Sequence, residues 1–258
     1  MTVWRLLETG ARPGRWNMAC DAALLEGAAS PTLRLYAWDP PAVSLGHHQP
    51  APSPGELARL ASLGLDWVRR PTGGRAVFHG GPDDELTYSV VAPIGEAGFP
   101  GGLADAYRRI HATIAAGLGA LGATVALAPP PARGAGRRIP PVRGLACFAA
   151  SVPGEITAGG RKLVGSAQRR SRRALLQHGS IPLAGDQGPL ARVWPGSLPD
   201  ERPTNLSVAV GRRVAFGDVA GALAAAFEEA LDARLEPGLL TAEEESGIEA
   251  LASEPALA

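Results

Sequence analysis

The sequence lacks most of the features that mark membrane, secreted and metal-binding proteins. No apolar run reaches the ~20 residues of a transmembrane helix, and the segment MTVWRLLETGARPGRW has no apolar centre like that of a signal peptide. Only two cysteines occur in 258 residues, and the CxxC and HExxH motifs are absent. We therefore expect a cytoplasmic protein with no membrane contact, no disulfide framework and no bound metal.

The chain also has no excess of positive or negative charge, and it contains almost no lysine. The formal net charge is zero, which argues against a nucleic-acid partner. Twenty-four arginines accompany a single lysine, Lys162. A chain that uses arginine almost everywhere should keep a lysine where a guanidinium cannot replace it, because an ammonium is compact and can lose its proton. Lys162 is therefore a candidate functional residue, against the plainer interpretation of a solvated lysine.

The zero net charge hides a cationic block in the middle of the chain. Residues 128–185 contain ten basic residues and one acidic residue, Glu155, whereas residues 186–258 contain five basic and thirteen acidic residues. The block can attract an acidic partner, or the acidic C-terminal part can neutralise it within the molecule. Within the block, residues 128–144 form an irregular Pro/Gly/Arg segment, which in a compact domain is usually functional or mobile.

The length and a hydrophobic content of 45% suit one large domain. Capping signals and apolar periodicity predict helices over 18–29 (with Asn17 as N-cap), 54–63, 104–121 and 218–234. Runs of β-branched and aromatic residues predict strands over 32–38, 43–46, 66–70, 75–79, 85–92, 123–127 and 174–183, and a hairpin over 154–164. The order of these elements predicts an α+β fold, with a mixed, largely antiparallel sheet flanked by helices.

The motif RRPTGGRAVFH is the first candidate binding element. Gly73 and Gly74 would let backbone N–H groups approach a ligand closely, and the flanking Arg70 and Arg75 suit an anionic or carbonyl group. His79 ends the motif and is a candidate site residue. The plainer interpretation is a turn between strands, followed by a structural histidine.

A second set of candidates lies in the cationic block. Cys147 follows the basic segment, and a thiol near cations has its thiolate stabilised, although an inert core cysteine is the plainer interpretation. Lys162 is predicted on the return strand of the hairpin. The small residues that follow it would allow close packing against an extended apolar ligand, and they are Gly165, Ser166 and Ala167.

Taken together and in this order, RRPTGGRAVFH, ELTYSVV, ACF, GRKLVGSAQ and LQHGSI resemble the biotin/lipoate A/B protein ligase family over about residues 4–183. The family fold is similar to the catalytic domain of class II aminoacyl-tRNA synthetases and biotin protein ligases. The resemblance implies a catalytic domain over 1–235, followed by an acidic C-terminal tail over 236–258. A cysteine fifteen residues before the GRK lysine resembles the cysteine-dependent octanoyltransferase branch, which acts in lipoate biosynthesis.

The resemblance implies an octanoyl-[acyl-carrier-protein]:protein N-octanoyltransferase. Cys147 would take octanoyl from acyl carrier protein as a thioester, with Lys162 favouring the thiolate, and a lysine of a lipoyl domain or H protein would accept it. Arg75 and His79 would line the acyl and carrier entrance, and the 128–144 segment would dock the acidic carrier. Backbone N–H groups near Gly165, Ser166 and Ala167 would form the oxyanion site. No cofactor is implied beyond this co-substrate.

Other functions remain open at this point. An ATP-dependent lipoate–protein ligase would need ATP and Mg²⁺ but not Cys147, and an amidotransferase would move octanoyl between carrier proteins. A non-catalytic carrier-binding protein could use the same fold. A thiol hydrolase would pair Cys147 with His79 or His178, but neither histidine lies in a recognisable protease signature, and His178 is expected in the core.

Overall fold

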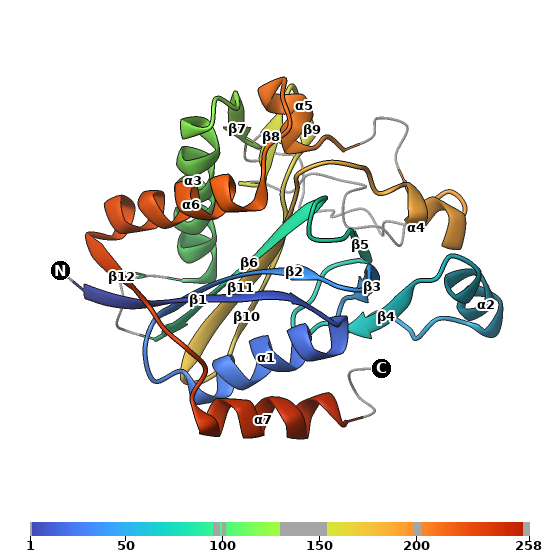
Figure 1. Ribbon diagram of the computed structural model, residues 1–258, viewed down its shortest axis with the longest axis horizontal. Coiled ribbons are helices and arrows are strands. Elements are labelled where there is room, and N and C mark those ends of the chain that lie inside the picture. The colour runs from blue at the N-terminus through green and yellow to red at the C-terminus, as the bar shows by residue number, and fades with distance from the viewer. Residues whose placement is uncertain (1, 95–98, 100–101, 130–153, 199–202, 255–258) are drawn as a thin grey trace, which may run out of the picture.

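The computed structural model describes residues 2–94, 99, 102–129, 154–198 and 203–254. A six-stranded sheet forms its centre, with the strand order β10-β11-β6-β2-β1-β12 (Figure 1). In chain order, these strands are β1 (Thr2–Arg12), β2 (Thr32–Trp38), β6 (Glu85–Pro93), β10 (Gly165–Arg170), β11 (Ala174–Pro182) and β12 (Ala233–Pro237).

Two small sheets accompany the large one. The first has the order β4-β3-β5 and contains β3 (Ala42–Leu45), β4 (Asp66–Arg69) and β5 (Val77–His79). The second has the order β7-β8-β9 and contains β7 (Val125–Leu127), β8 (Ile156–Ala158) and β9 (Arg161–Lys162). Within the described residues, six of the nine strand pairings are antiparallel, so the mixed, largely antiparallel α+β fold predicted from the sequence is confirmed.

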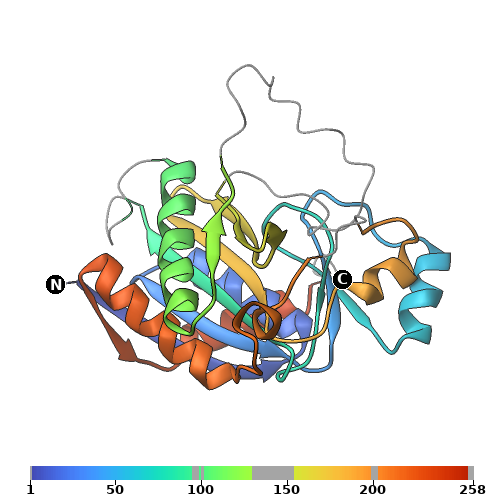
Figure 2. The same ribbon diagram turned by 90° about the horizontal axis from the view of Figure 1, so that it is seen from above.

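Helices cover both faces of the large sheet, as Figures 1 and 2 show. Side chains on one face, such as Leu33 and Leu35 of β2, form a core with α3 (Leu103–Ala120) and α6 (Phe216–Leu231). On the opposite face, α1 (Gly14–Gly27) packs against the sheet, and α7 (Ala242–Ala252) covers α1. The remaining helices are short: α2 (Pro54–Ser62), α4 (Gly188–Val193) and α5 (Leu206–Val210).

Helix α1 begins four residues earlier than predicted. Its N-cap is Pro13, and Asn17 lies inside the helix, so the prediction of Asn17 as the cap is wrong. The Asn17 amide is buried and donates to the main-chain oxygens of Arg12 and Ala37 at 3.0 and 2.9 Å. Asn17 therefore ties the helix to the ends of β1 and β2 instead of satisfying the first N–H groups of the helix.

The segment predicted as an acidic tail contains the end of β12 and all of α7. Thr241 caps α7 and accepts a hydrogen bond from the Glu244 N–H, and three glutamates occupy the first turn, where the helix dipole favours negative charge. Glu244 also pairs with Arg5 of β1 at 2.6 Å, and Ile248 is buried against α1. Within the described residues, no helix is both long enough and apolar enough to span a bilayer.

Candidate active site

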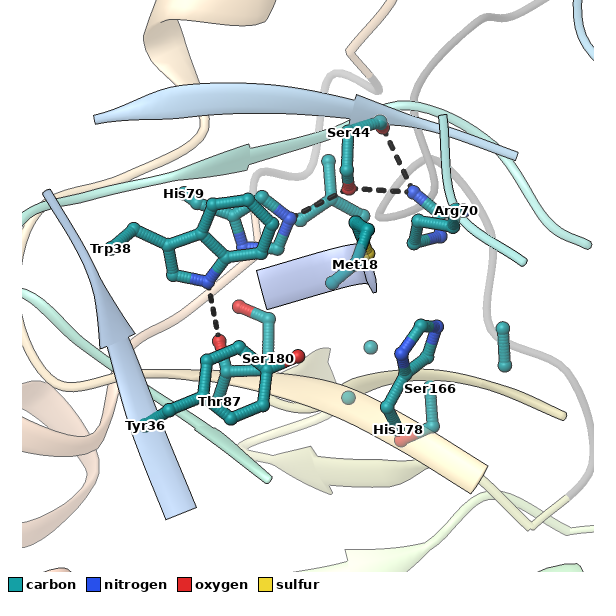
Figure 3. Close-up of a pocket in the computed structure, with 14 residues that line it drawn as sticks. Met18, Tyr36, Trp38, Ser44, Arg70, His79, Thr87, Ser166, His178 and Ser180 are labelled. Carbon is teal, nitrogen blue, oxygen red and sulfur yellow. Dashed lines mark hydrogen bonds between the residues drawn. The ribbon is translucent and has the colours of Figure 1, made fainter. Parts of the chain in front are cut away.

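A pocket lies between α1, the six-stranded sheet and the β4-β3-β5 sheet (Figure 3). It contains about 330 Å³ of empty space, which includes open solvent. Five residues predicted for the site from the sequence line it: Arg70, His79, Gly165, Ser166 and Ala167. The other lining residues are Met18, Tyr36, Trp38, Ser44, Val77, Thr87, His178, Gly179 and Ser180.

His79 is held on one wall of the pocket by a chain of hydrogen bonds. Its Nδ1 lies 2.7 Å from Glu85 Oε1, and its Nε2 lies 2.6 Å from Ser44 Oγ. In the neutral imidazole, Nδ1–H donates to Glu85, and Nε2 accepts from the Ser44 hydroxyl. The ring also stacks on Trp38 at a centroid distance of 3.8 Å, as Figure 3 shows. These contacts fix the imidazole and place the flat face of Trp38 in the pocket wall.

Arg70 organises the glycine-rich loop that follows β4. Its guanidinium donates to the main-chain oxygens of Ser44, Gly73 and Arg75 at 2.8 to 3.0 Å, and to Ser44 Oγ at 2.8 Å. Gly74 has φ +92°, and its carbonyl packs directly against Gly46, where there is no space for a side chain. Thus Arg70 lines the pocket while holding the loop in shape, whereas Gly73, Gly74 and Arg75 are not among the lining residues.

A second buried network surrounds Asp21 of α1. Its carboxylate accepts from Arg34 at 2.7 Å, from Tyr36 at 3.0 Å and from His178 Nδ1 at 2.7 Å. Burial works to raise the pKa of Asp21, but the Arg34 charge and the His178 bond outweigh it, so that pKa is lowered. Burial lowers the pKa of His178, and its Nε2 meets Thr72 Oγ1 at 2.6 Å. The expectation that His178 belongs to the core is met, although its edge also lines the pocket.

The third network fixes the orientation of Ser166. His111 of α3 lies 2.6 Å from the Gly154 carbonyl through Nδ1 and 2.8 Å from Ser166 Oγ through Nε2. Burial lowers the pKa of His111 to about 4, so the ring is neutral near pH 7. A carbonyl can only accept, so Nδ1 carries the proton, and Nε2 accepts from the Ser166 hydroxyl. The Tyr88 hydroxyl also lies 2.7 Å from Ser166 Oγ.

Lys162 of β9 is buried and paired, which excludes a solvated surface lysine. Its Nζ donates to Glu155 Oε1 at 2.6 Å, and each of these side chains is 3% exposed. Its charge acts together with burial to lower the pKa of His111, which links Lys162 to the Ser166 side of the pocket. Cys147 and residues 130–144 of the basic segment lie outside the described residues, so the pairing of Cys147 with Lys162 stays a prediction.

Sequence patterns had not indicated several residues of these networks. His111 lies in α3, where nothing in the sequence distinguishes it from the other buried residues of that helix. Ser44 and Asp21 belong to no recognised motif. A usable signal did exist in β2, where Arg34, Tyr36 and Trp38 alternate with aliphatic residues and therefore share one face. Among the described residues, no three His, Cys, Asp or Glu side chains are grouped so that they could hold a metal ion.

Gly179 of β11 gives a direct test of the pocket's packing. A methyl group there would lie 2.7 Å from both the Gly165 carbonyl oxygen and the Tyr88 ring, and it would also clash with the Ser166 hydroxyl. We expect Gly179→Ala to lower the free energy of unfolding by about 2 kcal/mol, because overpacking forces such atoms apart. This corresponds to a fall in Tm of roughly 4–8 °C, measurable by thermal unfolding.

Gly119→Ala is the matched control. Gly119 lies in α3, and a methyl group there meets no atom within 4 Å. Alanine is the better helix former, so this change should leave Tm unchanged or raise it slightly. An unchanged Tm in Gly179→Ala would contradict the tight packing between β10 and β11.

Comparisons with a family model, with known protein sequences and with solved structures agree with one another. The family model of the lipoyl protein ligase A/B catalytic domain matches residues 13–228. The chain is 42% identical to the octanoyltransferase LipM of Kyrpidia tusciae, over 97% of this chain and 95% of the relative. It is also 42% identical to the octanoyltransferase LipM of Symbiobacterium thermophilum, over 97% and 94% of the two chains. A solved structure of lipoate-protein ligase A bound with ATP has a TM-score of 0.77 and 25% identity, over 99% of this chain and 95% of that one.

Proposed function

Because the chain belongs to the lipoyl protein ligase A/B catalytic domain family, we propose that it is an acyltransferase that moves octanoyl groups in lipoate biosynthesis. The family expected from the sequence motifs is confirmed. The observation that carries the proposal is the 42% identity, over nearly the whole chain, to proteins named as octanoyltransferases. The donor is octanoyl-acyl carrier protein, and the acceptor is a lysine of a lipoyl domain or of glycine cleavage H protein.

The reaction proceeds in two acyl transfers through Cys147. The Cys147 thiolate attacks the carbonyl carbon of the octanoyl thioester, the carrier thiolate leaves and takes up a proton, and an octanoyl-cysteine thioester remains. The neutral ε-amine of the acceptor lysine then attacks this thioester. An amide forms, the amine loses its proton, and the Cys147 thiolate is released. The first step exchanges one thioester for another, and the second is downhill because an amide replaces a thioester.

Described residues supply the surroundings that this chemistry needs. Met18, Trp38 and Val77 give the pocket apolar walls for an acyl chain. Lys162 pairs with Glu155 in a buried setting, and a thiol near its ammonium group would ionise more easily. In the six-stranded sheet β10 is an edge strand, so alternate N–H groups of Gly165–Arg170 point away from β11. Such groups suit the oxyanion of a tetrahedral intermediate.

A second function is favoured by one observation, the similarity to a lipoate-protein ligase A bound with ATP. Such an enzyme would activate free lipoate with ATP and would not form a cysteine thioester. The two functions differ in the co-substrate they require, and a test in solution separates them.

The test is an acyl-transfer assay on a purified lipoyl domain, read by intact mass. With octanoyl-acyl carrier protein and no ATP, we expect the lipoyl domain to gain one octanoyl group. A parallel reaction with free lipoate, ATP and Mg²⁺ should leave it unchanged. Modification only in the ATP reaction would establish the ligase instead. A third reaction, with octanoyl-H protein as the donor, detects amidotransfer.

A further inference from the structure

A groove with a cationic rim lies beside the pocket. Both are lined by α1 and by the β10–β11 hairpin, and the groove lies nearer the C-terminal end of α1 and the turn of the hairpin. The arginine groove, as we name it, is lined by Ala22, Leu25 and Glu26 of α1 and by Arg169, Ser171, Arg172 and Arg173 of the β10–β11 hairpin. It encloses about 760 Å³ of empty space, which includes open solvent. Three arginines therefore face one glutamate across the groove, and Arg170 is exposed next to them.

Ion pairing within the described residues does not account for these arginines. Arg169, Arg170, Arg172 and Arg173 are all exposed, and within the described residues none of them forms an ion pair. The turn that carries them is held by Ser171, whose N–H donates to the Ala174 carbonyl and whose hydroxyl accepts from the Ala174 N–H. The side chains of Arg172 and Arg173 are therefore not needed to form the hairpin.

The groove and the pocket lie along the same two elements, α1 and β10. Along α1, Met18 lines the pocket, while Ala22 and Leu25 line the groove, and these positions share one helix face. The rise of an α-helix places Met18 and Leu25 about 10 Å apart. Along β10, Ala167 lines the pocket and Arg169 lines the groove. The Arg169 guanidinium also donates to the Pro71 carbonyl, in the loop that Arg70 organises, at 3.3 Å.

We propose that the arginine groove is the docking site of the acyl donor, an acidic carrier protein that presents its acyl group on a long thiol-bearing arm. This inference rests on the proposed function and names a surface for the donor within the described residues. Most of the 128–144 segment, which is expected from the sequence to dock the carrier, lies outside them. Clustered arginines on a chain of zero net charge create a local positive potential that attracts carboxylates. The separation of groove and pocket favours the donor over the acceptor, because the four-carbon stem of a lysine is shorter than the roughly 10 Å between Met18 and Leu25.

The experiment measures binding and chemistry separately. Fluorescence anisotropy gives the Kd of labelled octanoyl-acyl carrier protein for the wild type and for the Arg172→Ser/Arg173→Ser variant at low and high ionic strength. We expect about tenfold weaker binding by the variant at low salt and a smaller difference at 0.5 M salt, because screening removes the attraction. Acylation by octanoyl-N-acetylcysteamine, an uncharged thioester, should proceed at the wild-type rate in the variant.

Arg212→Ser/Arg213→Ser is the matched control, because this exposed pair lies on the turn after α5, at the opposite end of the molecule in Figure 1. It should bind the donor with wild-type affinity. A Kd for Arg172→Ser/Arg173→Ser equal to that of the wild type would overturn the docking site, as would weaker binding of the lipoyl-domain acceptor alone. If the uncharged thioester acylates neither the wild type nor any variant, the result contradicts the proposed function. The anisotropy measurement still decides whether the groove binds the donor.

Discussion

Replacing Cys147 by alanine is expected to abolish octanoyl transfer, with a loss of about 10³-fold or more in kcat/KM. Without the thiolate no thioester can form on the enzyme, and the remaining pocket can only hold the acyl group near the acceptor. The measurement is the rate at which a lipoyl domain gains octanoyl from octanoyl-acyl carrier protein. Transfer at more than a tenth of the wild-type rate would show that the reaction does not pass through Cys147.

The chain offers a matched control in its other cysteine. Cys20 is fully buried in α1, and burial raises the pKa of its thiol to about 11. It therefore stays protonated near neutral pH and has no access to substrate. The Cys20→Ala variant should keep wild-type transfer activity and show only the small loss of stability expected from a minor change in the core. Similar losses of activity in both variants would point to misfolding instead of lost chemistry.

The second large effect is expected at Lys162. Lys162→Met leaves the Glu155 carboxylate buried without its cationic partner, which should lower the free energy of unfolding by about 3–5 kcal/mol. Lys162→Arg keeps the charge but replaces a compact ammonium with a larger, planar guanidinium at a position that is 3% exposed. We expect Lys162→Arg to lose most of its transfer activity. Urea unfolding and the transfer assay give the two quantities.

A double variant separates stability from function at this position. Glu155→Leu/Lys162→Met removes both buried charges, and such replacements are often neutral or stabilising. It should recover most of the stability that Lys162→Met loses, yet remain inactive. Recovery of activity together with stability would reduce Lys162 to a structural residue. Full activity in Lys162→Arg would remove the argument drawn from the single lysine of the sequence.

The strands with clear alternation could be predicted from the sequence, and β1 could not. In β2 every residue is buried, with aliphatic and polar or aromatic side chains on opposite faces. In β1 the buried residues Trp4 and Leu7 belong to the cores on opposite faces of the sheet, so neither face shows a repeated apolar position, and the register shifts between Glu8 and Gly10, where Gly10 has φ +69°. A bulge of this kind breaks the two-residue period on which strand prediction depends.

The candidate site could also be predicted only in part. Motifs indicated the chain segments that line the pocket, because small residues and clustered charges are visible along the sequence. The partners of those segments come from distant positions. His178 meets Asp21 across 157 residues, and Lys162 meets Glu155 only because the hairpin folds back. No spacing rule joins such pairs, since they meet only when α1 packs against β11 and when β8 pairs with β9.

The most direct test is the mass of the enzyme itself after it has been mixed with octanoyl-acyl carrier protein in the absence of an acceptor. The proposed function predicts a species heavier by one octanoyl group, located by peptide mapping on Cys147, and its loss when a lipoyl domain is added. Cys147→Ala should show no such species. Transfer to the lipoyl domain without any acylated enzyme, or an octanoyl group on a different residue, would contradict the thioester mechanism.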